Sequence, residues 1–511
     1  MHTLVLRHVA DSDPPRFQVT RPGGRATSAL AVVPPTGFPV EGRPGSDLLK
    51  ELQWYLETFL DYPFSPETEH AERVLAALRS WGEQAFNALF DNRDGGGMLS
   101  AAKASGYDHL LLQIWSDEPE ILAWPWEALR DPQGSALAPA CQIERRLDTV
   151  GDPAPIPSGL PTDRVNILLV IARPYERDVK FRSISRPLVE LIAKHNLPAH
   201  VHVLRPPTFD RLREHLRERP NHYHLVHFDG HGAYGGAPAP TGPHTYQAPE
   251  GRLVFENDKG EAAPATAEKL SALLQEYRVP AMVLNACQSA MLDDKAADPF
   301  ASVAASLLKA GTRSVVAMSY SLYVSGAQQF LPAFYRRLFE TGSFADAARA
   351  GRQQMFSERG RVCSRGHFDL QDWLVPVVYQ QAADALSFAA AARPPASSRK
   401  GIPEEAVDVD LPYGFIGRDG PLLELERALR RSTPAILIHG LGGIGKTTLA
   451  RGFVGWLAAT EGLSDGCLWL SFHDIRSAEY VVNRLGEPLF GGAFSAASMD
   501  QKLDALIGVF K

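Results

Sequence analysis

The middle of the chain alternates short apolar runs with amphipathic segments. Five apolar runs, at residues 165–171, 199–204, 223–228, 281–285 and 314–318, have the length and composition of strands that are covered on both faces. Predicted helices separate them, at residues 185–195, 209–216, 267–277 and 300–310. This order predicts an α/β fold with a mostly parallel sheet and helices on both faces.

The regions on either side of this alternation have patterns of their own. Residues 1–107 are interpreted as a support region of strands and helices, one of which follows the helix-capping residue type at Asp47. Residues 108–384 form the predicted core. A stretch rich in Ala, Pro, Ser and acidic residues, 385–412, is predicted to be a linker before a second domain at 413–511.

Two of the apolar runs end in side chains that can carry chemistry. One leads through Asp229 to His231 and Gly232, and the other leads through Asn285 to Cys287. The carboxyl ends of parallel strands share one sheet edge, where catalytic groups collect in open α/β sheets. Cys287 follows His231 by 56 residues, and caspases place their histidine roughly 50 residues before the cysteine. We therefore predict a dyad with Cys287 as nucleophile and His231 as general base.

The positions of the residues beside this dyad suggest supporting roles for them. Gly232 is predicted to form a tight turn whose backbone N–H, with that of Cys287, makes an oxyanion hole. Asp229 and Asn285 are candidates for the substrate pocket, although Asp229 could equally lie on the surface or cap a helix and Asn285 could equally hold the turn. The alternative for Cys287 is an inert buried thiol. No second ligand cluster accompanies the histidines before His231, so no zinc site is predicted there.

The residues around both strand ends resemble the CHAT family of bacterial caspase-like peptidases. The resemblance rests on His227-Phe-Asp-Gly-His-Gly232 and Val283-Leu-Asn-Ala-Cys-Gln-Ser-Ala290, and it extends over about residues 45–384. It includes Leu52-Gln-Trp-Tyr-Leu-Glu57, Trp124-Pro-Trp-Glu-Ala-Leu129 and Asp372-Trp-Leu-Val-Pro-Val377. It implies a caspase-like fold and cysteine endopeptidase activity with no fixed third catalytic residue. Some caspase relatives select a basic P1 residue with an acidic side chain two positions before the cysteine. Asn285 is neutral, so a basic P1 is not predicted. By the same analogy, residues 289–298 are a candidate activation loop, with an ordinary solvated loop as the default.

A phosphate-binding motif lies in the second domain. It follows an apolar run at residues 435–439, interpreted as a strand, and precedes a predicted helix at 449–457, the context that a P-loop requires. Its backbone N–H groups would hold the phosphates of ATP or ADP, with Lys446 reaching the β and γ oxygens and Thr447 binding Mg²⁺. The predicted nucleotide-binding residues are Gly440, Leu441, Gly442, Gly443, Ile444, Gly445, Lys446, Thr447 and Thr448.

This motif and Phe415-Ile-Gly-Arg-Asp-Gly420 before it resemble the entry of NB-ARC-type (STAND) signalling ATPases. The resemblance implies an α/β P-loop NTPase domain that is incomplete at its C-terminus. The strand with the second Mg²⁺ ligand and a sensor region are expected beyond Lys511. The combined hypothesis is an ATP-regulated endopeptidase that self-assembles on activation, as the effector of a bacterial signalling or antiviral immune receptor, and cuts a protein substrate. The alternatives are a catalytically silent scaffold that docks partners, and an ATPase regulated by the peptidase region.

Composition and charge restrict the partners and the cellular location that can be expected for this protein. The 511 residues carry a net charge of −7, so no nucleic-acid partner is predicted. No apolar run reaches the roughly 18 residues of a membrane span, and the start of the chain lacks the pattern of a signal peptide. The four cysteines are widely scattered and do not form a disulfide framework. A reducing, cytoplasmic location is expected.

Overall fold

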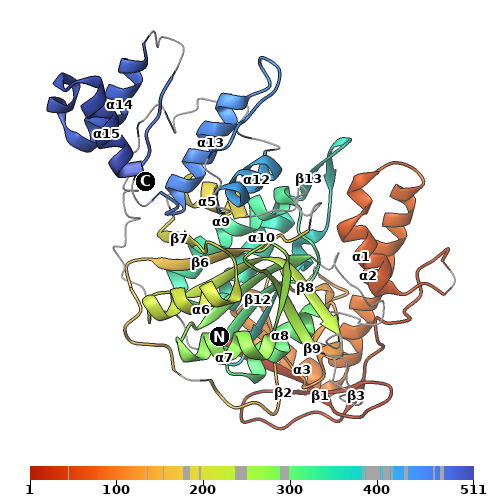
Figure 1. The fold of residues 1–511 in the computed structure, drawn as a ribbon. Helices are drawn as coiled ribbons and strands as arrows, with labels where there is room; N and C mark the ends of the chain where they lie inside the picture. The colour runs from red at the N-terminus through yellow and green to blue at the C-terminus, as the bar shows by residue number, and fades with distance from the viewer. Residues whose placement is uncertain are drawn as a thin grey trace, which may run out of the picture. The chain divides into compact units, whose positions relative to one another are not determined.

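The structure is a computed structural model, and the chain forms two compact units (Figure 1). One unit comprises residues 1–395 with 430–432, and the other comprises residues 396–429 with 433–511. The structure describes residues 1–43, 45–134, 136–153, 155–175, 185–194, 197–235, 250–287, 299–382, 386, 403, 406, 415, 418–430, 435–463, 466–471 and 477–510.

One large sheet organises the first unit, and thirteen strands belong to it among the described residues. Its main path runs in the order β10-β9-β8-β11-β12-β15-β5-β4-β1-β2-β3, while β6 pairs with both β7 and β8. A separate hairpin joins Gly360–Cys363 (β13) to Gly366–Asp369 (β14). The strands of the large sheet are His2–Val9 (β1), Arg16–Thr20 (β2), Leu30–Ala31 (β3), Leu110–Trp115 (β4), Gln142–Arg146 (β5), Val165–Ile171 (β6), Ala199–Val203 (β7), Leu225–Gly235 (β8), Glu250–Glu256 (β9), Ala262–Thr266 (β10), Ala281–Cys287 (β11), Ser314–Met318 (β12) and Pro376–Gln380 (β15).

The sheet is mostly parallel, as the apolar runs predict. β6, β7, β8, β11 and β12 run in the same direction, so their carboxyl ends meet at one edge. β15 pairs antiparallel with β12 and parallel with β5, which joins this half of the sheet to β4 and β1. The strands of the predicted support region are therefore part of the same sheet as the core.

Helices cover both faces of the sheet (Figure 1). α9 packs on α10 and on α5, and α10 also contacts β5, β12 and β15, while α8 packs on α7 and contacts β8, β9 and β12. Asp47 caps α1 as predicted, because its carboxylate accepts a hydrogen bond from the Leu49 N–H at 2.9 Å. The helices of this unit are Leu48–Glu57 (α1), Glu67–Phe90 (α2), Arg93–Lys103 (α3), Pro119–Leu122 (α4), Ser185–Lys194 (α5), Phe209–Glu218 (α6), Ala267–Glu276 (α7), Pro299–Lys309 (α8), Val324–Thr341 (α9) and Phe344–Ser357 (α10).

A buried charged triad stabilises the part of the sheet around β5. The Glu127 carboxylate accepts two hydrogen bonds of 2.7 Å from Arg145 and one of 3.1 Å from Arg352, and all three side chains are almost completely inaccessible to solvent. Burial alone would raise the pKa of Glu127, but the attraction and hydrogen bonds of Arg145, the charge of Arg352 and a backbone hydrogen bond together outweigh it and hold that pKa below its usual range. Glu127 is thus the ionised partner of two buried cations.

The segment Leu52 to Glu57 connects α1 to loops that are distant in the sequence. The Tyr55 hydroxyl accepts a hydrogen bond from the Gln371 N–H at 3.0 Å, and a Glu57 carboxylate oxygen accepts one from the Ser321 N–H at 2.7 Å. Gln371 precedes β15, and Ser321 follows β12 at the edge where the parallel strands end. The polar residues of this segment therefore hold the N-terminal region against the core.

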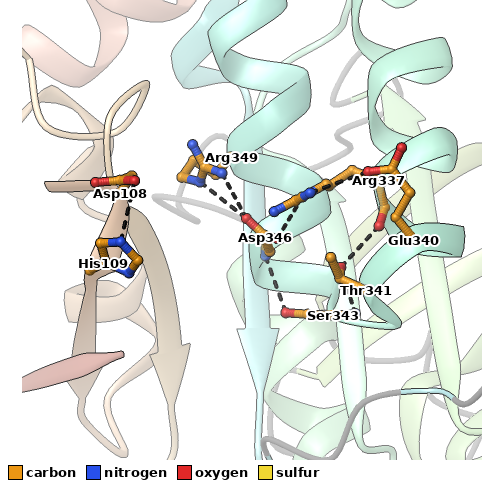
Figure 2. Close-up of polar contacts among 8 residues, drawn as sticks. All are labelled: Asp108, His109, Arg337, Glu340, Thr341, Ser343, Asp346 and Arg349. Atoms are coloured by element: carbon orange, nitrogen blue, oxygen red, sulfur yellow. Dashed lines mark hydrogen bonds and ion pairs between the residues drawn. The ribbon is translucent and has the colours of Figure 1, made fainter. Parts of the chain in front are cut away.

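The turn between α9 and α10 is held by an aspartate between two arginines (Figure 2). Asp346 accepts a hydrogen bond of 2.7 Å from Arg337 Nε and bonds of 3.1 and 2.9 Å from Arg349. Ser343 caps α10 by accepting a bond from the Asp346 N–H. Gly342, with φ of +66°, ends α9, and a Cβ there would lie 1.9 Å from the Leu386 carbonyl oxygen. This position therefore requires glycine.

In the second unit, the regular elements among the described residues are all helices, which corrects one prediction. Residues 435–440 and 466–471 contain no strand, so the predicted strand before the P-loop is not observed and an α/β P-loop domain is not shown. The Leu437 side chain is 84% exposed, whereas a strand within such a sheet would bury its apolar side chains. A strand needs lateral hydrogen-bond partners, and the described residues of this unit include no strand that could pair with residues 435–440. The helices of the unit are Asp419–Arg430 (α12), Lys446–Ala459 (α13), Ala478–Phe490 (α14) and Met499–Phe510 (α15).

Within the described ranges, the helices include none that is both long and apolar enough to cross a membrane.

Candidate functional site

The two predicted catalytic residues are direct neighbours across adjacent strands. β8 and β11 pair in parallel from Leu225 with Ala281 to His231 with Cys287. His231 and Cys287 are thus Cα partners in one ladder at the carboxyl edge of the sheet. Two residues separated by 56 positions in the sequence are brought together by the backbone hydrogen bonds of this strand pair.

The strand that carries His231 is longer than its apolar run predicts. β8 continues to Gly235, because residues 231–235 pair antiparallel with β9. Gly232 lies opposite Leu253 in this ladder, so the predicted tight turn at Gly232 is wrong. The ladder to β9 carries the extended backbone past the point where the apolar pattern stops. The oxyanion hole from the N–H groups of Gly232 and Cys287 stays a prediction.

Asp229 is the centre of a buried polar cluster behind this pair. The side chain of Asp229 is 0% exposed, so the alternative of a surface position is wrong. One carboxylate oxygen accepts hydrogen bonds from the Arg173 guanidinium and, at 2.9 Å, from the Asn285 amide, and the other accepts one from the Ser185 hydroxyl. The arginine neutralises the charge of the carboxylate inside the protein.

Arg173 and Tyr175 belong to the site but were not among the predicted residues. They follow the carboxyl end of β6, where the Arg173 N–H donates to a Glu256 carboxylate oxygen at 3.0 Å. The Tyr175 ring meets the His231 imidazole edge to face, with centroids 5.1 Å apart and planes at 71°. The signal that could have found them is their position, since they directly follow a continuous apolar run at the same sheet edge.

Two other histidines of this region have structural surroundings. The His224 Nδ1 accepts a hydrogen bond from the Asn166 N–H at 3.0 Å, and its Nε2 lies 2.9 Å from the Pro161 carbonyl, which requires the neutral ring. Burial lowers the pKa of His224 to about 4 and that of His227 to about 4. His227 lies 3.3 Å from the Tyr335 hydroxyl in the core. The described residues contain no group of three or more His, Cys, Asp or Glu side chains arranged to hold a metal ion.

The predicted P-loop contains three glycines with unusual backbone angles. Gly440, Gly443 and Gly445 have φ values of +149°, +80° and +89°, which residues with a side chain rarely adopt. α13 begins at Lys446, whose ammonium group donates to the carbonyls of Gly440 at 3.0 Å and Leu441 at 2.8 Å. The loop is thus closed by its own lysine at a helix N-terminus.

The residues before this loop contact the loop itself and the two helices that flank it. Arg418 donates to the Ile444 carbonyl at 2.7 Å, and Phe415 packs against the cluster of Leu422, Leu425 and Leu449. A contact of Phe415 or Arg418 with a nucleotide base stays a prediction. The candidate activation loop at 289–298 lies outside the described residues, as does the predicted linker at 385–412 except for residues 386, 403 and 406. The predicted domain boundaries likewise stay predictions.

Comparisons with known proteins identify the larger unit. Residues 82–388 match the family model described as the CHAT domain. No curated protein matches the chain. Two crystal structures of the separase–securin complex of Saccharomyces cerevisiae are similar to it at 15% and 16% identity, each with a TM-score of 0.27. The matches cover 67% and 66% of this chain, and this chain spans about a fifth of the matched chains, at 21% and 20%. Because the family model matches more than half of its residues, the chain belongs to the CHAT domain family of caspase-like peptidases.

Proposed function

We propose that this protein is a cysteine endopeptidase in which Cys287 attacks the peptide carbonyl and His231 acts as general base. The observation that carries the proposal is the direct pairing of His231 with Cys287 at the carboxyl edge of the sheet. A histidine beside a cysteine favours the thiolate, which is the nucleophile, and then gives a proton to the leaving amine. The proposed substrate is a protein, and the proposal does not specify the residues at its cleavage site.

The second part of the proposal is that ATP or ADP with Mg²⁺ binds at the P-loop and controls the peptidase. The support is the complete motif, the positive φ angles of its glycines and the start of α13 at Lys446. Glycines that expose successive backbone N–H groups at a helix N-terminus form an anion site. Bound nucleotide would release Lys446 from the loop carbonyls, and Thr447 would bind Mg²⁺. A role in bacterial signalling or antiviral defence, with assembly on activation, follows from the resemblance to NB-ARC-type ATPases alone.

The proposed nucleophile should be the most reactive thiol of the folded protein. At pH 7 we expect iodoacetamide to alkylate Cys287 before Cys141, Cys363 and Cys467, with the rate at each cysteine followed by mass spectrometry of peptides. Burial raises the pKa of Cys141 to about 12 and also raises that of Cys467, which makes both slow internal references.

The His231→Ala variant completes this test. Its Cys287 should react more slowly at pH 7, because the imidazole that favours the thiolate is removed. If Cys287 in the unmodified protein labels no faster than the other three cysteines, the alternative of a silent scaffold that docks partners is favoured.

The Lys446→Ala variant should separate nucleotide binding from the peptidase chemistry. We expect ATP affinity to fall roughly thirtyfold, which corresponds to about 2 kcal/mol for the loss of a charged partner of the phosphates. Calorimetry of the full chain with ATP and Mg²⁺ measures this, and Arg484→Ala, at an exposed position of α14, is the matched control. Peptide cleavage is then compared with and without ATP. Equal rates in every case would reject control by the nucleotide.

A further inference from the structure

The cluster around Asp229 connects four elements that meet behind the proposed dyad. The backbone carbonyl of Asp229 accepts a hydrogen bond from the Ala172 N–H at 2.9 Å, which ties β8 to the end of β6. Its carboxylate accepts from Arg173 after β6, from Ser185 at the start of α5 and from Asn285 on β11. One residue thus holds three neighbouring elements against β8.

The register places this cluster immediately before the reactive pair. Asp229 is the ladder partner of Asn285, and His231 is the ladder partner of Cys287 two residues later. Two residues along a strand correspond to about 6.6 Å. The 2.9 Å hydrogen bond from the Asn285 amide to the Asp229 carboxylate therefore links β8 to β11 two residues before the proposed dyad.

The surroundings make this connection rigid. The side chains of Asp229, Arg173, Ser185 and Asn285 are all at least nine-tenths buried, so water does not compete for their hydrogen bonds. The carboxylate stays oriented because it is held by donors on both oxygens. The segment that begins at Arg173 also carries Tyr175 onto the ring of His231, and the Arg173 N–H is anchored on Glu256.

We propose that Asp229 is a positioning residue, which through Asn285 and Arg173 holds the ends of β6, β8 and β11 so that His231 stays in reach of Cys287. The proposal rests on the proposed peptidase function. It assigns Asp229 and Asn285 to the support of the dyad and not to the substrate pocket. The amide of Asn285 is committed to Asp229, and the charge of Asp229 is balanced by Arg173.

The test is the pH profile of Cys287 alkylation in the Asn285→Leu variant of the full chain. Leucine keeps much of the volume and removes the donor, and it leaves the Arg173–Asp229 pair intact. Iodoacetamide is the probe, and mass spectrometry gives the rate at Cys287 from pH 5 to 10. In the unmodified protein we expect a midpoint below the value of about 8.5 for a free cysteine. In the variant the midpoint should rise toward 8.5, and the rate at pH 6.5 should fall about tenfold for each unit of that rise.

A matched control comes from the same sheet. Gln113 on β4 donates to Glu144 on the neighbouring parallel strand β5 at 2.6 Å, which is the same kind of bond far from the site. Gln113→Leu should lower the unfolding temperature and leave the Cys287 profile unchanged. If Asn285 contributes only to stability, Asn285→Leu should likewise lower the unfolding temperature and leave the Cys287 profile unchanged.

The possible results distinguish the positioning role of Asp229 from the peptidase proposal itself. A shifted midpoint in the unmodified protein that persists in Asn285→Leu would overturn the positioning role. A midpoint near 8.5 in the unmodified protein would instead contradict the peptidase proposal. If Asn285→Leu does not fold, Asp229→Asn serves as the second variant, since it keeps an acceptor oxygen and loses the charge that holds Arg173. An unchanged profile there would also overturn the role.

Discussion

Peptide cleavage should fall by about a thousandfold or more when Cys287 is replaced by alanine, and to a similar extent in His231→Ala. The two groups would act as one unit, so removing either leaves the other without a partner for the attack. The assay is the release of fluorescence from a pool of quenched peptides of mixed sequence, with ATP and Mg²⁺ present. Mixed peptides are needed because Asn285 is neutral and engaged by Asp229, which leaves the P1 preference open.

Cys363→Ala is the appropriate control for this pair of variants. Cys363 is a half-buried thiol at the end of the β13–β14 hairpin, and its replacement should leave cleavage within about twofold of the unmodified rate. Residual cleavage in Cys287→Ala that equals the rate of the unmodified protein would mean that another residue, or another protein in the preparation, is the nucleophile.

The largest loss of stability is expected from Glu127→Ala. This change leaves two completely buried guanidinium groups, those of Arg145 and Arg352, without their shared carboxylate. Removing one partner of a buried ion pair costs about 3–5 kcal/mol, because the remaining charge stays desolvated and unpaired. Urea unfolding followed by tryptophan fluorescence measures the change, since Trp124 and Trp126 lie within three residues of Glu127 in the sequence.

The comparison variant is Arg79→Ala, which breaks an exposed pair. The Arg79 side chain is 62% exposed and lies 2.9 Å from Glu83 on the same helix, so we expect a loss below about 1 kcal/mol. If Glu127→Ala were as mild as Arg79→Ala, the triad would contribute little to the stability of the CHAT unit.

The strands of the core could be predicted because burial on both faces leaves a simple signal. Residues 165–171 and 314–318 are the observed β6 and β12, and Asp47 caps α1. Polar strands gave no such signal. β5 has the sequence Gln-Ile-Glu-Arg-Arg, and it is buried because Arg145 finds Glu127 and Glu144 finds Gln113. Such partners come from distant parts of the chain, so a local pattern cannot reveal them.

The candidate site also combines features that the local sequence reveals with features that depend on residues distant in the sequence. The order and spacing of His231 and Cys287 could be read from the sequence, and their pairing in one ladder agrees with it. The length of β8 could not be read, because its last residues are held by β9 and not by an apolar pattern of their own. Arg173 escaped notice because its role depends on a carboxylate 56 positions away.

In the second unit, the sequence indicated local backbone features of the glycine-rich loop, but it did not correctly predict the strand before it. Three glycines of the predicted P-loop have positive φ angles and α13 begins at Lys446, whereas the strand expected before the loop is not observed. Backbone conformation in a glycine loop is encoded within a few residues. A strand depends on neighbours that supply its lateral hydrogen bonds.

The continuation of β8 beyond His231 has a consequence for how this protein could be switched. His231 is held between β11 and β9, whereas Cys287 is paired with β8 and lies three residues past the last described pair between β11 and β12. If His231 is the base, its backbone is fixed from two sides. We therefore expect a signal that controls the proposed cleavage to act through the presentation of Cys287.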